Sequence, residues 1–192
     1  MNKGRVEAFS DGVLAIIITI MVLELRVPAG DTLAALRPLI PKFLSYLLSF
    51  IFIGIYWNNH HHLWQAVKRV NGSILWANLH LLFWLSLIPF VTGWMGEHHF
   101  ATVPVALYGG VLWLSGMAYY IMVLRLLAYH GEDSLLVAAI GDGRKERLSL
   151  FIYTAAVPIA LLNSWMALAL YVTVAILWLI PDRRIEKVFD QP

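Results

Sequence analysis

Two groups of side chains in this sequence can bind ions or exchange protons within a largely apolar chain. One is the carboxylate of Asp11, which lies with Ser10 directly before an apolar run over 13–23. The other is a run of three histidines, 60–62. Ionisable groups at the edge of hydrocarbon are costly, so they tend to be paired, buried in protein or in contact with water. The first apolar segment is therefore expected to line something other than lipid.

The spacing of the histidines argues against a metal site. Consecutive helical residues point in different directions, whereas a metal site needs histidines one turn apart or a third ligand nearby. His80 is the only other histidine within an apolar run, and the chain has no cysteine. We expect no metal site and no cofactor, and we expect these histidines to hydrogen-bond across helices.

Sequence signatures of enzymes are absent. The chain contains no nucleophile elbow, zinc-protease helix, P-loop or dinucleotide fingerprint. The Thr-Val-Gly-Tyr-Gly filter of ordinary potassium channels is absent too. An enzyme built on the histidine run would lack a nucleophile at the same depth. We expect neither an enzyme nor a nucleic-acid-binding protein.

The composition is that of an integral membrane protein. The 192 residues are 60% hydrophobic with a mean hydropathy of +0.71, and 14% are charged, against roughly 25% in soluble domains. Apolar runs long enough to cross a bilayer predict one all-α domain over 1–192 with six spans. These are about 7–25, 42–65, 73–93, 102–128, 148–163 and 165–181.

The basic residues predict the orientation of these spans. With both termini in the cytoplasm, the outer side keeps only Arg26, Arg37 and Lys42. This asymmetry of 11 to 3 follows the positive-inside rule and predicts a multi-pass protein of the cell (inner or plasma) membrane. The eleven inner residues are Lys3, Arg5, Lys68, Arg69, Arg125, Arg144, Lys145, Arg147, Arg183, Arg184 and Lys187.

This orientation brings three polar clusters to one depth. The first span begins at Ser10 and Asp11, the second ends at 60–62, and the third begins near Asn78. We therefore expect one connected network near the inner face. Asp11 also has a simpler explanation, because acids in the first turns of a helix interact favourably with its dipole.

One face of the first span leaves two interpretations open. Ile16, Ile20 and Leu23 are spaced 4 and 3 apart and share a helical face, with Thr19 beside them. Periodicity alone favours an apolar packing stripe on which Thr19 bonds to its own backbone. The polar residues at the start of the span favour a face that looks onto water or an ion path.

The same residues resemble a known family. The first span opens with the pattern Arg5-x-x-x-Phe9-Ser10-Asp11, which is similar to the signature of the transmembrane protein 175 family. The resemblance continues through Trp57-Asn58-Asn59-His60-His61, then Asn78-Leu79 and Leu87-Ile88-Pro89-Phe90. It is specific over the first 90 residues and rests on span count beyond them. The family comprises endosomal and lysosomal potassium channels of animals and bacterial relatives.

The resemblance implies the architecture of the pore. A bacterial-type chain carries one six-span repeat, so this chain is expected to form a homotetramer with four copies of the first span around the axis. Ile16 would be the first hydrophobic constriction, followed by Thr19, Ile20 and Leu23. The network holding the pore helix would comprise Arg5, Phe9, Ser10, Asp11, Asn78 and either His60 or His61.

The implied function is a potassium-permeable cation channel with modest selectivity over sodium. Its partners would be other copies of the chain, transient potassium ions in the pore and the lipid bilayer. The alternative is a proton-coupled transporter or proton channel that uses Asp11 with His60, His61 and His80 as a relay. Such a relay would need a site at the membrane midplane, whereas these polar groups cluster at the inner end.

Overall fold

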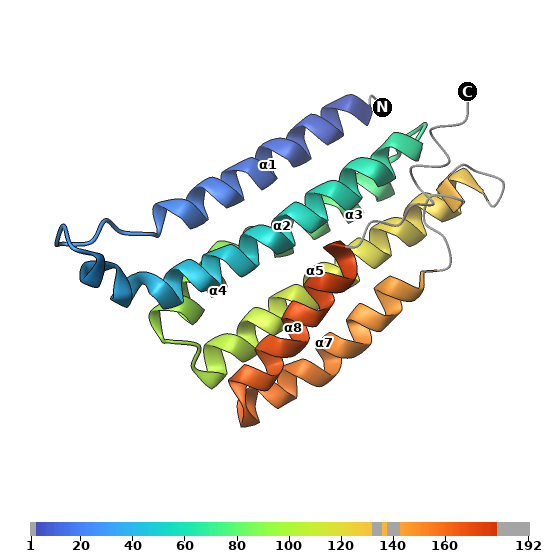
Figure 1. Ribbon diagram of the computed structural model, residues 1–192. Coiled ribbons are helices and arrows are strands. Elements are labelled where there is room, and N and C mark those ends of the chain that lie inside the picture. The colour runs from blue at the N-terminus through green and yellow to red at the C-terminus, as the bar shows by residue number, and fades with distance from the viewer. Residues whose placement is uncertain (1–2, 132–135, 138–142, 180–192) are drawn as a thin grey trace.

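The computed structural model describes residues 3–131, 136–137 and 143–179, and Figure 1 shows long helices running side by side. No strand occurs in these residues, and the predicted all-α class is confirmed. The elements are α1 (Lys3–Leu23), the 3-10 helix η1 (Leu33–Leu39), α2 (Ile40–Ala66), α3 (Gly72–Ser86), α4 (Ile88–Glu97), α5 (Thr102–His130), α7 (Arg144–Leu162) and α8 (Ser164–Leu179).

Several of these helices are long and apolar enough to cross a membrane. Four such stretches lie within the described ranges: Lys3–Leu23, Leu33–Ala66, Gly72–Glu97 and Thr102–His130. The helix Ser164–Leu179 is also apolar but shorter. Such helices fit a multi-pass membrane protein. A helix pairs its own backbone N–H and C=O groups and so leaves few of them unpaired in the lipid.

The third predicted span consists of two helices. It is interrupted at Leu87, between the last residue of α3 and the first of α4. Pro89 explains the interruption, because proline lacks a backbone N–H and its ring excludes the carbonyl four residues earlier. The Ser86 hydroxyl donates to the Phe83 carbonyl at 2.7 Å and so supplies a hydrogen-bond donor to one backbone carbonyl near the break.

The last two helices form a hairpin with a one-residue connection. Asn163 has an extended backbone (φ −153°, ψ 105°), and its Oδ1 accepts from the backbone N–H groups of Trp165 and Met166 at 3.0 and 3.2 Å. Asparagine is favoured at this position because its side chain satisfies N–H groups at the start of a helix. The residue thus ends α7 and caps α8.

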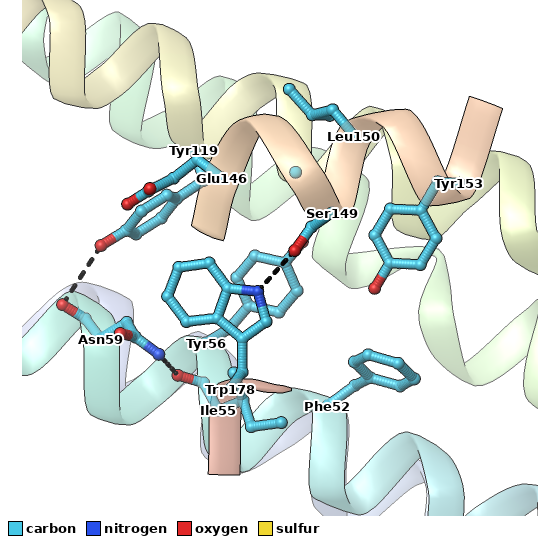
Figure 2. A pocket seen from close by; sticks show the side chains of 11 residues that line it. Phe52, Ile55, Tyr56, Asn59, Tyr119, Glu146, Ser149, Leu150, Tyr153 and Trp178 are labelled. Atoms are coloured by element: carbon cyan, nitrogen blue, oxygen red, sulfur yellow. Dashed lines mark hydrogen bonds between the residues drawn. The ribbon is translucent and has the colours of Figure 1, made fainter. Parts of the chain in front are cut away.

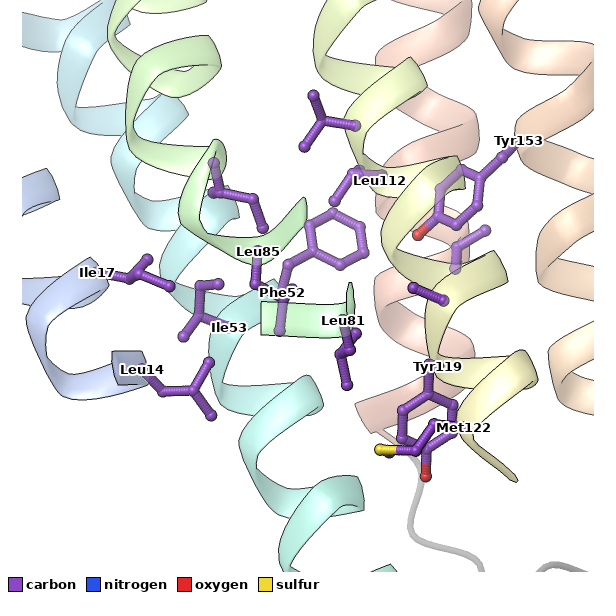
Figure 3. Close-up of a cluster of buried hydrophobic side chains, with 14 of the residues drawn as sticks. Leu14, Ile17, Phe52, Ile53, Leu81, Leu85, Leu112, Tyr119, Met122 and Tyr153 are labelled. Atoms are coloured by element: carbon purple, nitrogen blue, oxygen red, sulfur yellow. The ribbon is translucent and has the colours of Figure 1, made fainter. Parts of the chain in front are cut away.

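Helix α5 lies at the centre of the packing. It contacts α3 and α4 on one side of the bundle and α7 and α8 on the other, whereas α1 packs against α2, α3 and α4. Figure 3 shows the core between these elements, which is dominated by aliphatic and aromatic side chains that are at most 3% exposed. They include Leu14, Ile17, Phe52, Ile53, Leu81, Leu85 and Leu112.

Long-range contacts define two ends of the bundle. At one end, which we call the Lys3 end, Lys3 Nζ donates to the Trp64 carbonyl and the Arg69 N–H donates to His130 Nε2. At the opposite end, the Lys42 end, Lys42 and Glu97 form a salt bridge of 2.8 Å. The start of α1, the end of α2 and the end of α5 therefore lie together at the Lys3 end.

Candidate functional site

Helix α1 has one buried and one uncovered face. The buried residues Val6, Ser10, Leu14, Ile17 and Met21 follow steps of 3 or 4 and pack against α2, α3 and α4. The residues predicted to line the pore lie on the opposite face. Exposed fractions are 60% for Ile16, 44% for Ile20 and 74% for Leu23, and Thr19 is also exposed.

The Thr19 hydroxyl is oriented by its own helix. Its Oγ1 donates to the Ala15 carbonyl at 2.8 Å. A hydroxyl has one donor and two acceptor lone pairs, so this bond uses the hydrogen and leaves the lone pairs available on the uncovered face. The uncovered face therefore presents one residue with oxygen acceptors among aliphatic side chains.

A buried polar cluster lies behind this face near the Lys3 end. Ser10 Oγ donates to the Val6 carbonyl at 2.8 Å and accepts from Asn78 Nδ2 at 3.0 Å. Asn78 Oδ1 lies 2.9 Å from His60 Nε2. Ser10, Asn78 and His60 are each at most 2% exposed, so these bonds join α1, α3 and α2 away from water.

His60 also contacts Trp64, and one ring nitrogen serves both neighbours. Trp64 Nε1 donates to His60 Nε2 at 2.7 Å, the same atom that faces Asn78 Oδ1. A protonated Nε2 can donate to Asn78, whereas an unprotonated Nε2 accepts from Trp64. The cluster thus has two mutually exclusive hydrogen-bond patterns, selected by the position of one proton.

Asp11 belongs to a second, more exposed contact. Its Oδ1 accepts from Trp57 Nε1 at 3.0 Å, and the Trp57 ring stacks on His61 at 5.8 Å between centroids. The structure therefore places His60 in the buried cluster and His61 in this outer contact. Arg5 and Phe9 lie on the exposed side of α1, and Phe9 is 55% exposed.

Three residues outside the predicted network take part in these contacts. Trp57 and Trp64 contact Asp11 and His60, and Lys3 Nζ lies 3.0 Å from the Trp64 carbonyl at the end of α2. An ammonium group near a helix C-terminus satisfies unpaired carbonyls and interacts favourably with the dipole. In a sequence, tryptophans near the ends of spans predict only an aromatic belt at the membrane interface. The hydrogen bonds that these tryptophans make can be found only from the structure.

The half of α1 nearer the Lys42 end rests on a cluster of hydroxyl groups. Ser49 Oγ lies 2.6 Å from Thr92 Oγ1 and 3.0 Å from the Tyr108 hydroxyl. Thr92 Oγ1 is 4.0 Å from the sulfur of Met21, which belongs to the buried face of α1. Contacts from α2, α4 and α5 therefore converge where α1 approaches its end.

An open groove of about 700 Å³ runs beside the uncovered face of α1 at the Lys42 end. Ile20 and Glu24 line one part of it, and Phe90, Trp94 and Glu97 of α4 line another. Ile20 belongs both to the wall of this groove and to the exposed face that carries Ile16 and Leu23. Within the described ranges, no group of three His, Cys, Asp or Glu side chains is arranged to hold a metal ion.

Sequence comparisons identify relatives that are channels. The family described as endosomal/lysosomal potassium channel TMEM175 matches residues 5–89. A potassium channel of Chryseobacterium sp. is 57% identical over 97% of each chain. A potassium channel of Chamaesiphon minutus is 30% identical, covering 91% of this chain and 92% of the relative.

Two further comparisons concern a more distant relative and a solved structure. The human endosomal/lysosomal proton channel TMEM175 is 35% identical over 46% of this chain, which spans 20% of the human protein. The crystal structure of a lysosomal potassium-selective channel TMEM175 homolog from Chamaesiphon minutus superposes with a TM-score of 0.81 at 26% identity. That match covers 93% of this chain and 96% of the other.

Proposed function

Because the chain belongs to the TMEM175 family of potassium channels, we propose that it forms a potassium-permeable pore lined by the uncovered face of α1. The family confirms a channel protein in place of an enzyme. The observation that carries the pore assignment is the exposure of Ile16, Ile20 and Leu23 on a helix whose other face is fully packed.

The proposed pore requires several copies of the chain. One α1 helix cannot enclose a path, and its aliphatic face is covered by no other described element. We propose a homotetramer in the cell membrane, with four α1 helices around the axis and six spans in each chain. The Lys3 end then lies in the cytoplasm, in agreement with the positive-inside rule.

The proposed gate is a hydrophobic neck. Four Ile16 side chains form an apolar constriction that excludes water when narrow, so that ions stop without a plug. A small rotation or outward shift of α1 widens the neck and wets it. Potassium sheds its hydration water at lower cost than sodium, and Thr19 oxygens replace part of that shell. A neck with so few oxygen ligands gives modest selectivity.

A second candidate function is proton conduction. Human TMEM175 carries the name proton channel, and His60 has two hydrogen-bond patterns that differ by one proton position. However, the buried cluster of Ser10, Asn78 and His60 lies near one end of the bundle, whereas a relay must cross the membrane. Potassium permeation is therefore the better supported function.

Ion flux from liposomes tests this choice. Purified protein is reconstituted and exposed to a potassium gradient and then to a matched sodium gradient, each with and without a proton carrier. We expect potassium flux that exceeds sodium flux and that persists without a proton gradient. An Asp11→Asn variant should still carry potassium, because that carboxylate contacts Trp57 and is not required as a relay.

Two results would contradict the proposal. Flux that occurs only when protons move in exchange would identify a proton-coupled transporter, and His60 and Asp11 would become its candidate sites. Equal potassium and sodium flux with no response to substitutions on the face of α1 would remove this face from the ion path.

A further inference from the structure

Two polar side chains within the predicted spans take no part in the site described above. They are His80 of α3 and Asn58 of α2, and both are exposed on the surface of the single chain. Hydrocarbon offers no partner to a polar group, so polar residues inside a span usually face another helix or water. Among the residues that the structure describes, neither has a hydrogen-bond partner on another helix.

The His80 ring presents a donor whose position is fixed. Trp84 Nε1, which can only donate, donates to His80 Nε2 at 2.9 Å. Nε2 therefore carries no hydrogen, and the uncharged ring holds its hydrogen on Nδ1. No described residue accepts from this Nδ1. The exposed face of α3 thus offers an N–H group to whatever covers it.

Asn58 differs from the asparagine beside it. Asn59 Nδ2 donates to the Ile55 carbonyl at 2.8 Å, and the Tyr119 hydroxyl donates to the Asn59 carbonyl at 3.4 Å (Figure 2). Asn59 is therefore bonded within its own chain. The side chain of Asn58 makes no hydrogen bond to any residue in the described part of the chain. Its Oδ1 is an acceptor with two lone pairs, so α2 presents an unused acceptor.

The contact between His60 and Asn78 shows that the two exposed residues lie at the same depth. His60 Nε2 and Asn78 Oδ1 are 2.9 Å apart, on helices that run in opposite directions. Asn58 comes two residues before His60, and His80 comes two residues after Asn78, so both lie about 3 Å farther from the Lys3 end. Two residues also turn by about 200° around a helix axis. Asn58 and His80 therefore point away from the contact, on opposite flanks of the chain.

The two flanks are also complementary in shape. On α3, Trp76 and Phe83 lie one turn before and after His80 and are 75% and 55% exposed. On α2, Gly54 lies one turn before Asn58, and a Cβ atom there would meet nothing within 4 Å. Phe83 and Gly54 both lie about 5 Å beyond the polar residues, away from the Lys3 end. A projecting ring on one flank thus matches a hollow on the other, and small residues allow membrane helices to approach closely.

We propose that the His80 flank of α3 binds the Asn58 flank of α2 in a second copy of this chain. His80 Nδ1 donates to Asn58 Oδ1 of the neighbouring copy, and Phe83 packs over Gly54 there. Because the two surfaces differ, each copy uses both, and the contacts run head to tail around a ring. Helix α1 packs against both α2 and α3 and so lies between the two flanks. The inference rests on the homotetramer proposed above and names the surfaces by which its copies meet.

Disulfide formation in membranes tests this contact, since the chain has no cysteine of its own. Membranes that contain the full chain with Asn58→Cys and His80→Cys together are oxidised with copper phenanthroline and analysed on a non-reducing gel. We expect a ladder of dimers, trimers and tetramers, because each chain then links to two neighbours. Chains that carry only one of the two substitutions should remain monomers.

The matched control combines His80→Cys with Phe151→Cys. Phe151 is 72% exposed on α7, which packs against α5 and α8 and lies away from both flanks. This chain should remain a monomer. No ladder from the Asn58→Cys and His80→Cys chain, or an equal ladder from the control, would overturn the proposal. A dimer from either single-cysteine chain would also overturn it, because identical surfaces would then be in contact.

A substitution at Gly54 tests the same contact without a cysteine. Gly54→Leu has room within its own chain but fills the hollow that receives Phe83. The fraction of detergent-solubilised chains that elute as tetramer should fall by about threefold or more, since a single interhelical contact in a membrane has an effect of this size. Gly110→Leu on α5 is the control, because a Cβ there also meets nothing within 4 Å, and its elution should not change. Equal elution of the two variants would contradict the contact.

Potassium flux from liposomes separates this inference from the proposed function. A ladder from the Asn58→Cys and His80→Cys chain, with no potassium flux through the unmodified protein, would support the contact and contradict the channel. Potassium flux through the unmodified protein, with no ladder from the double-cysteine chain, would contradict the contact and leave the channel supported.

Discussion

At the scale of single residues, α1 carries two hydroxyl groups in opposite environments. Ser10 is fully buried and is both donor and acceptor, whereas Thr19 is exposed and donates only to its own backbone. A buried polar group that loses its partner is costly, and an exposed one exchanges its partner for water. The same class of hydroxyl therefore positions the helix at Ser10 and faces the proposed ion path at Thr19.

Ser10→Ala should lower the thermal stability of the detergent-solubilised protein. The change leaves the buried Asn78 Nδ2 without its acceptor, which costs about 1–3 kcal/mol. Ser86→Ala is the control, because that hydroxyl is exposed and also donates to a backbone carbonyl. Adding Asn78→Leu to Ser10→Ala should restore part of the loss, since both partners are then apolar and His60 Nε2 still accepts from Trp64 Nε1. Equal melting temperatures for Ser10→Ala and Ser86→Ala would contradict this role.

Ile16→Asn should increase potassium flux severalfold in liposomes. The amide would hydrate an apolar neck that otherwise excludes water. Val22→Asn introduces the same amide at a position 43% exposed on the flank of α1, away from the centre of the uncovered face. Its flux should stay near that of the unmodified protein. An unchanged flux in well-assembled Ile16→Asn protein would place the neck elsewhere.

At the scale of elements, α2 and α4 approach each other closely at Gly96. A Cβ atom on Gly96 would lie 2.9 Å from the Lys42 Cα and even closer to Ser45 Oγ. Small residues allow helices in membranes to pack with their backbones near each other. The crossing point lies one residue before Glu97, which forms the salt bridge to Lys42.

Gly96→Ala should destabilise the protein, although alanine is the better helix former. The added methyl group meets backbone atoms of α2, and overpacking of this kind costs about 1–3 kcal/mol. Gly93→Ala is the matched comparison on the same helix, because a Cβ there meets nothing within 4 Å. That variant should gain up to about 1 kcal/mol from helix propensity. Melting temperatures that shift in the same direction for both would refute the close crossing.

The helical class was predictable from the sequence, and several details were not. Long apolar runs predict membrane helices, because every backbone polar group must be paired within the segment. The break at Leu87 depends on how Pro89 is accommodated by neighbouring helices, which hydropathy does not report. The selection of His60 for the buried cluster depends on the rotation of α2 about its axis. His60 and His61 are chemically identical and differ only in the direction in which they leave the helix, so the sequence could not decide which of the two joins the buried cluster.

At the scale of the whole molecule, the single chain leaves a large aliphatic face of α1 uncovered. Apolar side chains on an outer helix can face lipid or a neighbouring chain, and exposure alone does not decide between them. The polar cluster behind α1 and the groove beside it favour a neighbouring chain over lipid as the partner of this face. Helix α8 also has exposed apolar residues, but it packs on the other side of the bundle, against α2, α5 and α7.

The absence of cysteine from the sequence allows a direct test of which face meets the neighbouring chain. A single Leu23→Cys substitution lies on the uncovered face, at a residue that is 74% exposed. If four α1 helices surround the axis, a short bis-maleimide added to membranes should join two chains through this thiol, and a dimer band should appear on a denaturing gel. Ile176→Cys places a thiol on α8 at a residue that is 55% exposed, and because we expect this side of the bundle to meet lipid, it should give only monomer. A dimer from Ile176→Cys alone would put α8 at the subunit contact and remove α1 from the axis.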